Sequence, residues 1–171
     1  MSDPPADDAH RLAAQIGDTL KRRRQTVATS ESCTAGLVSA ALTSVSGASD
    51  FFWGGAVVYR AEAKIELAGL NAAFLAAHGT VSAATTEALA VAIRARADTT
   101  YGVAVTGWAG PDAPSGETVG DVYGAVASPR RVSSARWRLE GDRAAVRTAA
   151  AAAVLELLRD CLAAADDAPD D

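Results

Sequence analysis

Thr26-Val-Ala-Thr-Ser-Glu-Ser-Cys-Thr-Ala-Gly36 is the stretch from which the predicted fold follows. A short β-prone run ends there in a hydroxyl-rich turn, and the helix-prone stretch Leu37 to Leu42 comes next. The first N–H groups of a helix have no partner within it and carry the positive end of its dipole. Ser32 is therefore placed to attack a carbonyl carbon while such groups hold the developing oxyanion. The alternative is that Ser30 or Ser32 only caps the helix.

Turn-forming residues such as glycine and proline divide the rest of the chain into alternating helices and strands. Besides the strand at residues 26–29, we expect strands at 55–59, 101–106, 119–127 and 132–139. We expect helices at 9–24, 37–42, 61–68, 71–78, 82–97 and 143–164. The turn between the last two strands is too short for a crossover helix, so this pair is predicted to be antiparallel. The pattern predicts an α/β fold, a three-layer α/β/α sandwich with a mixed, mainly parallel sheet of about five strands.

The size of the chain fits one domain. It has 171 residues, of which 49% are hydrophobic, and domains cluster at roughly 100 to 200 residues. We expect this domain to span residues 9–165. Flexible acidic tails, rich in Asp, Pro and Ala, are expected at 1–8 and 166–171.

Charge and cysteine content limit the possible functions. The 16 basic and 21 acidic residues give a net charge of −5 with no long basic stripe, which argues against nucleic acid as a partner. No apolar run approaches the ~20 residues that span a bilayer. The two cysteines form no disulfide framework and the N-terminus lacks a signal-peptide pattern, so we expect a cytoplasmic protein that is not bound to a membrane. No His/Cys/Asp cluster has the spacing of metal ligands, and neither a metal nor another cofactor is expected.

The reactive side chains gather after three of the predicted strands. They lie in the segments 29–36, 59–64 and 106–111. In open sheets of this kind, ligands bind beyond the carboxyl ends of the parallel strands. We therefore predict that the three segments form one site.

Ser32 needs a base, because an unassisted hydroxyl is a poor nucleophile at neutral pH. The two histidines, His10 near the N-terminus and His78 at a helix end, fit surface or packing roles better. Lys64 is the better candidate, provided that burial beside Tyr59 lowers its pKa from about 10.4 toward neutral. The alternative is that Lys64 is an exposed helix lysine and Tyr59 a strand residue that packs on a neighbour.

The residues on either side of Ser32 also have candidate roles. Glu31 either orients Lys64 or Thr34 through a hydrogen bond, or lies near the positive end of the helix, where a carboxylate is favoured. Cys33 is expected to point to a different face from Ser32, as a small buried residue rather than a nucleophile.

Two further segments suit an anionic ligand. The loop Thr106-Gly-Trp-Ala-Gly-Pro111 offers free N–H groups to a phosphate or carboxylate, although glycine loops often only turn the chain. Arg143 and Arg147 lie four residues apart, hence on one face of the last helix. There they either clamp an anion or remain solvated.

Taken together, these motifs resemble the CinA C-terminal domain family over roughly residues 10 to 163. The resemblance rests on Ser30-Glu-Ser-Cys-Thr-Ala-Gly36, Gly55 to Tyr59 with Glu62-Ala-Lys64, Val103 to Pro111, Val119-Gly120, and Gly141-Asp-Arg-x-x-Val-Arg147. The family often has a second glycine where this chain has Ala35, and an asparagine in the stretch where it has Arg60-Ala61. Trp108 replaces a commoner aliphatic residue.

The resemblance implies an activity and a set of site residues. The family is similar to nicotinamide mononucleotide deamidases of pyridine nucleotide salvage, which release ammonia and form nicotinate mononucleotide. By this likeness Ser32 is the nucleophile, Lys64 and Tyr59 activate it, N–H groups near Cys33 and Thr34 hold the oxyanion, and Glu31 orients the site. The substrate-binding residues that it implies are Ser30, Gly36, Thr106, Gly107, Ala109, Gly110, Arg143 and Arg147.

The resemblance also bears on assembly and on the limits of the activity. Together with alanine-rich helix faces, it leads us to expect a homo-oligomer. Longer family members carry a nucleotide-processing N-terminal domain, so no pyrophosphatase activity is expected of this chain. The alternative to an amidohydrolase, motivated by Ala61 and by the lack of a well-placed histidine base, is a catalytically weak or inactive module for nucleotide binding or assembly.

Overall fold

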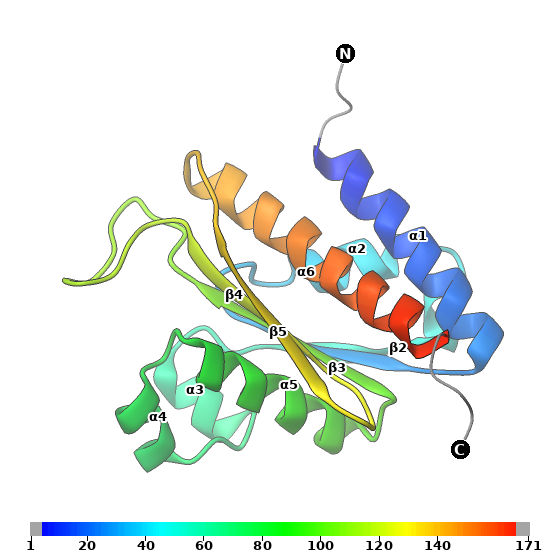
Figure 1. Ribbon diagram of the computed structural model, residues 1–171, viewed down its shortest axis with the longest axis horizontal. Coiled ribbons are helices and arrows are strands. Elements are labelled where there is room, and N and C mark those ends of the chain that lie inside the picture. The colour runs from blue at the N-terminus through cyan, green and yellow to red at the C-terminus, as the bar shows by residue number, and fades with distance from the viewer. Residues whose placement is uncertain (1–4, 167–171) are drawn as a thin grey trace.

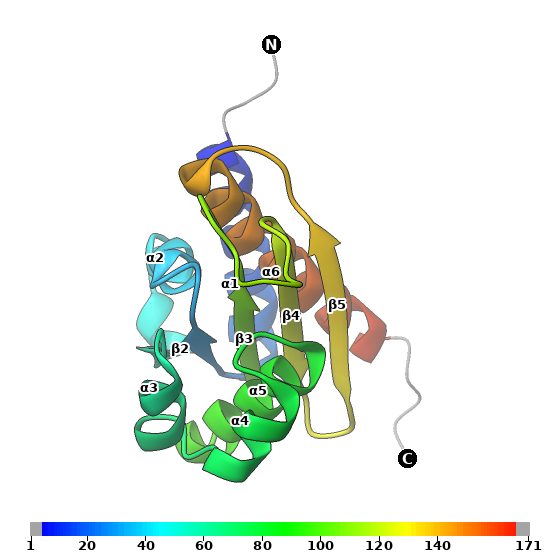
Figure 2. The ribbon, with the colours of Figure 1, turned by 90° about the vertical axis from the view of Figure 1, so that its left-hand side faces the viewer.

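A single five-stranded sheet forms the centre of the molecule. The computed structural model describes residues 5–166 of the chain. The strands are β1 (Val27–Glu31), β2 (Phe52–Val57), β3 (Tyr101–Gly107), β4 (Asp121–Ala127) and β5 (Val132–Arg138), in the spatial order β2-β1-β3-β4-β5. Figure 2 shows β2 at one edge of the sheet and β5 at the other.

The strand pairing is mixed, as predicted. β1 pairs in parallel with β2 and β3, whereas β4 is antiparallel to both β3 and β5. The predicted antiparallel pair at the end of the sheet is therefore confirmed. The four pairings divide evenly, two parallel and two antiparallel. β4 alone opposes the common direction of the other strands.

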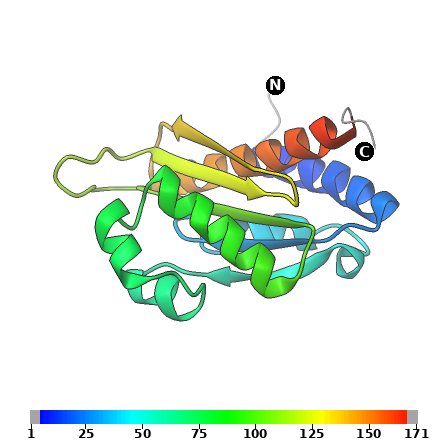
Figure 3. The same cartoon turned by 60° about the horizontal axis from the view of Figure 1, so that its bottom comes forward.

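Helices cover both faces of the sheet and complete the three predicted layers (Figures 1 and 3). One face carries α1 (Pro5–Arg23), α2 (Leu37–Thr43) and α6 (Arg143–Asp166), with the short 3₁₀ turn Ala48–Asp50. The other face carries α3 (Ala61–Glu66), α4 (Ala72–His78) and α5 (Ala83–Ala97).

Helix α1 starts earlier than predicted. It begins at Pro5, a residue whose fixed φ suits the first turn of a helix. Residues 5–8 therefore belong to the helix and not to a tail. At the other end, α6 extends to Asp166, so this residue too belongs to a helix and not to a tail. The remaining parts of the two expected tails, 1–4 and 167–171, lie outside the described residues.

The two faces of the sheet are packed differently. The larger core lies under α1, α2 and α6, where the predicted apolar side of the last helix is buried through Ala151, Leu155, Leu158 and Leu162. On the other face α5 approaches the sheet closely. A Cβ atom at Gly102 of β3 would collide with the carbonyl oxygen of Ala90 in α5, so only glycine fits there. This close packing fixes α5 against β1 and β3.

Candidate active site

One cavity joins the three segments that follow β1, β2 and β3. It has a volume of about 220 Å³. Its wall includes Ser32 and Cys33 after β1, Tyr59 and Lys64 after β2, and residues 107–110 after β3. Arg143, from the first turn of α6, completes the side chains that were expected there. The parallel strand ends thus bring the predicted segments together.

Lys64 lies beside Ser32 in the interior of the protein. Its side chain is only 1% exposed. The amine Nζ donates to the carbonyl oxygens of Val58 (2.8 Å) and Tyr59 (3.3 Å) and lies 3.3 Å from Ser32 Oγ. Burial lowers the pKa of Lys64 from its ordinary value of 10.5 to about 8. Lys64 is therefore not an exposed helix lysine.

The contacts of the Lys64 amine suit its neutral form. A neutral amine has two N–H donors and one lone pair, whereas an ammonium has three donors. The carbonyls of Val58 and Tyr59 occupy two donors, and the third contact is the hydroxyl of Ser32. With both N–H groups donated to carbonyls, the lone pair of the neutral amine is left for the Ser32 proton.

The phenol of Tyr59 takes no part in this contact. Its side chain is 53% exposed, and its hydroxyl accepts a hydrogen bond from Arg143 Nη2 at 2.8 Å. Tyr59 reaches Lys64 only through its backbone carbonyl. The Val58 carbonyl, which makes the shorter contact, had no signal in the sequence because any residue supplies a backbone oxygen.

Glu31 binds the start of α2. Its buried carboxylate accepts hydrogen bonds from the hydroxyls of Thr34 (2.7 Å) and Ser39 (2.6 Å). It also accepts from the N–H groups of Gly36, Val38 and Ser39, at 2.8 to 3.1 Å. Both predicted partners, Thr34 and the positive helix end, are therefore present, but no hydrogen bond between Glu31 and Lys64 is among the contacts of the described residues.

These contacts occupy one of the two predicted sources of oxyanion donors, the first N–H groups of α2. Helix α2 begins at Leu37, five residues after Ser32, and its first N–H groups are bound to Glu31. Neither Ser30 nor Ser32 caps the helix, because the cap position is Gly36 and no side-chain cap bond forms there. The other predicted donors, the N–H groups of Cys33 and Thr34, directly follow Ser32 in the chain. Within the described residues, neither of these two groups donates to a backbone carbonyl.

Cys33 is buried, as predicted, but it also lines the cavity. Burial raises the pKa of its thiol to about 11, against the opposing effect of its own N–H and that of Thr34. A thiol with so high a pKa is a poor nucleophile near neutral pH. The hydroxyl of Ser32 remains the better candidate.

The remaining predicted ligand residues separate into two groups. Gly107, Ala109 and Gly110 line the cavity together with Arg143. Thr106 is fully buried, and its hydroxyl shares a hydrogen bond with that of Thr86 at 2.8 Å. Outside the cavity wall lie Ser30, Gly36, Thr106 and Arg147.

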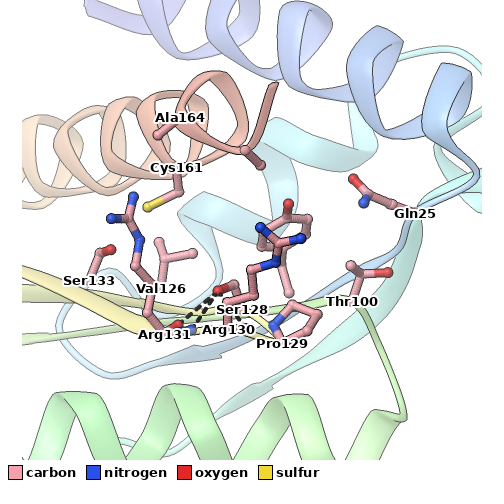
Figure 4. Close-up of a pocket in the computed structure, with 12 residues that line it drawn as sticks. Gln25, Thr100, Val126, Ser128, Pro129, Arg130, Arg131, Ser133, Cys161 and Ala164 are labelled. Atoms are coloured by element: carbon pink, nitrogen blue, oxygen red, sulfur yellow. Dashed lines mark hydrogen bonds between the residues drawn. The ribbon is translucent and has the colours of Figure 1, made fainter. Parts of the chain in front are cut away.

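A larger cavity of about 390 Å³ lies at the opposite end of the sheet. Figure 4 shows Arg131 extending toward Cys161 there. Burial raises the pKa of the Cys161 thiol, and the lining holds neither Lys64 nor another lysine to activate a nucleophile. We therefore place the candidate chemistry in the smaller cavity.

Residues 5–166 contain no group of three or more His, Cys, Asp or Glu side chains placed to hold a metal ion. Among the helices that the structure describes, none has the length and apolar character needed to cross a bilayer.

The family model for the CinA C-terminal domain matches residues 9–162. The chain belongs to this family. Among its relatives, a CinA-like protein of Myxococcus xanthus is 43% identical over 164 residues, which are 95% of this chain and 39% of that protein. A putative competence-damage inducible protein of Desulforamulus reducens is 37% identical over 90% of this chain and 38% of its own length. The CinA domain described here thus spans less than half of these relatives.

Solved structures of the family have the same fold. A competence-damaged protein (CinA) superfamily protein from Klebsiella pneumoniae matches with a TM-score of 0.88 at 30% identity, over 91% of this chain and 98% of that one. The competence/damage inducible protein CihA from Agrobacterium tumefaciens matches with a TM-score of 0.86 at 33% identity, over 91% and 96%. The CinA fold is therefore established for this chain.

Proposed function

We propose that this CinA domain is an amidohydrolase that converts nicotinamide mononucleotide to nicotinate mononucleotide and ammonia. The observation that carries the proposal is the buried amine of Lys64, with a pKa lowered to about 8, at 3.3 Å from Ser32 Oγ. A lysine of this kind can accept a hydroxyl proton near neutral pH.

The first half of the reaction acylates Ser32. Ser32 Oγ forms a bond to the carboxamide carbon while the Lys64 lone pair takes the hydroxyl proton. The N–H groups of Cys33 and Thr34 stabilise the oxyanion. Lys64 then returns its proton to the amide nitrogen and the C–N bond breaks. Ammonia departs, and the acyl group remains as an ester on Ser32.

The second half uses water in the same way. The water oxygen attacks the ester carbon while Lys64 takes a proton from the water. The bond to Ser32 Oγ breaks, and the proton passes from Lys64 to that oxygen. One water is consumed, and the nicotinate product and ammonia are released.

The wall of the cavity supports a zwitterionic nucleotide as substrate. Arg143 lies in the wall, where it donates to the Tyr59 hydroxyl and to the Gly110 carbonyl. A phosphate would offer this guanidinium a stronger, charged acceptor. Asp112 lines the same cavity and would suit the positive charge of the pyridinium ring.

Ala61, which was one reason for the binding-module alternative, does not displace Lys64. Lys64 is held by the backbone carbonyls of Val58 and Tyr59, and these contacts need no amide side chain at position 61. The departure from the family pattern therefore leaves the proposed base next to Ser32.

The deciding experiment measures ammonia released from nicotinamide mononucleotide by the wild-type protein, with Ser32→Ala as the control. We expect release by the wild type and a fall of at least about 10³-fold in the variant. No release, or equal release by both, would contradict the proposal. Tight binding in calorimetry without turnover would favour a binding module.

A further inference from the structure

Arg147 is bound to the turn that carries the nucleophile. We call residues 32–36 the nucleophile turn. Arg147 Nε donates to the Cys33 carbonyl oxygen and Nη2 to the Thr34 carbonyl oxygen, both at 3.0 Å. The guanidinium is partly buried and lies outside the wall of the active-site cavity. Its planar fork therefore holds two successive carbonyls and not a ligand.

The nucleophile turn is held from two sides. Glu31 accepts from N–H groups at the start of α2, while Arg147 donates to carbonyl oxygens of the turn. The backbone between them is unusual, since Ala35 has φ 49° and Gly36 has φ 101°. Such conformations persist when the surrounding contacts fix them.

The contact with Cys33 also affects an oxyanion donor. The Cys33 carbonyl and the Thr34 N–H belong to the same peptide unit. A cation bonded to the carbonyl oxygen polarises that unit and makes its N–H a stronger donor, because hydrogen bonds polarise one another. The guanidinium of an arginine supplies this positive charge.

We infer that Arg147 is a positioning residue, which orients and polarises the N–H groups that receive the oxyanion, and that it does not bind the substrate phosphate. The inference relies on the proposed function for the identity of the substrate. The attack by Ser32 can be followed with other reagents and does not require that substrate. It assigns different roles to two arginines one helical turn apart: Arg143 faces the cavity, and Arg147 holds the nucleophile turn.

Steady-state kinetics separates these roles. Arg147→Met should lower kcat by about 30- to 100-fold, somewhat less than the loss of an entire oxyanion donor, and change KM by less than about twofold. Arg147→Lys, which keeps the charge but loses the fork, should recover part of the rate. Arg143→Met should mainly raise KM. A raised KM at unchanged kcat for Arg147→Met would overturn the inference.

A second measurement does not depend on the nucleotide. A fluorophosphonate probe reacts when Ser32 Oγ bonds to phosphorus, fluoride leaves, and Lys64 takes the serine proton. We expect labelling to slow in Arg147→Met by about the same factor as kcat. Arg159→Met, an exposed arginine farther along α6 that pairs with Asp160, should label at the wild-type rate.

The two measurements distinguish failure of the proposed function from failure of the inference. Absence of ammonia with slowed labelling in Arg147→Met would contradict the proposed substrate and support the role of Arg147. Equal labelling of the wild type and Arg147→Met would overturn that role. If thermal melting shows that Arg147→Met does not fold, Arg147→Lys decides: slowed labelling supports the inference and wild-type labelling refutes it.

Discussion

Glu31 and Lys64 are buried ionisable side chains near the ends of the neighbouring parallel strands β1 and β2, and each is 1% exposed. Glu31 accepts five hydrogen bonds from the turn and the helix that follow it. Lys64 meets two carbonyls and one hydroxyl, and no carboxylate of the described residues forms a salt bridge with it. Equal burial therefore has opposite consequences at the two sites.

The difference lies in how well each charge is compensated. A buried carboxylate surrounded by donors ties together the segments that supply them. A buried ammonium without a counter-ion is destabilised relative to the neutral amine, so it gives up its proton more easily. Glu31 thus supports the nucleophile turn, and Lys64 is suited to move protons.

Substitution of Lys64 tests whether this residue is the base, and it should have the largest effect on activity. Lys64→Met keeps the length of the side chain and removes the amine, so we expect kcat for ammonia release to fall by about 10³-fold or more. The variant should nevertheless be as stable as the wild type or more stable, by about 1 to 3 kcal/mol, because an uncompensated charge is no longer buried. Urea denaturation at pH 7 measures the second effect. A less stable variant would contradict our account of Lys64.

Substitution of Glu31 should produce the opposite pattern. In Glu31→Gln, an NH₂ group replaces an oxygen that accepts N–H bonds from α2, so donors face donors. We expect a loss of roughly 3 kcal/mol in the free energy of unfolding, as for a broken buried charge network. Urea denaturation at pH 7 measures the loss. Glu62→Gln, at an exposed carboxylate that forms a salt bridge with Arg60, is the matched control and should change stability by less than about 0.5 kcal/mol. Equal effects of the two substitutions would refute the supporting role of Glu31.

The pH dependence of activity should report the lowered pKa of Lys64. With a pKa of about 8, about one Lys64 in ten is neutral at pH 7 and about nine in ten at pH 9. We therefore expect kcat to rise nearly tenfold between these values and then to level off. A pH-independent kcat over this range would exclude Lys64 as the base.

The same pKa should appear in the stability of the protein. An unfolded lysine titrates near 10.5 and the folded one near 8, so between these values the unfolded state binds more protons. Stability attributable to Lys64 then rises with pH across this window, by roughly 3 kcal/mol in total, and is constant below pH 8 and above pH 10.5. The difference in stability between wild type and Lys64→Met, measured from pH 7 to 10.5, isolates this contribution.

The sequence was sufficient to predict which segments meet. Hydrophobic runs broken by turns located β1, β2 and β3, and the parallel arrangement then placed Ser32, Lys64 and the loop at residues 107–110 around one cavity. The prediction succeeded because the ends of adjacent parallel strands are close whatever the side chains are.

The partners of individual side chains were less predictable. Arg143 and Arg147 share a helix face, yet only the packing of α6 against the nucleophile turn decides that Arg147 binds carbonyls more than 100 residues away. The N–H groups of Val38 and Ser39 at the start of α2, one of the two predicted sources of oxyanion donors, are bound by the Glu31 carboxylate. The contacts of Arg147 depend on tertiary distances, which residue spacing does not encode.

The smallest effect should come from relaxing the turn that Glu31 supports. Ala35 has φ 49°, a left-handed conformation that disfavours a side chain, and it stands where the family often has glycine. Ala35→Gly removes the clash but adds flexibility to the unfolded chain, so we expect a net gain of about 0.5 to 1 kcal/mol in the free energy of unfolding. Ala40→Gly, in the right-handed helix α2 nearby, should instead lose about 1 kcal/mol. A loss of stability in both variants would mean that the contacts of Glu31 and Arg147 leave no strain at Ala35 to relieve.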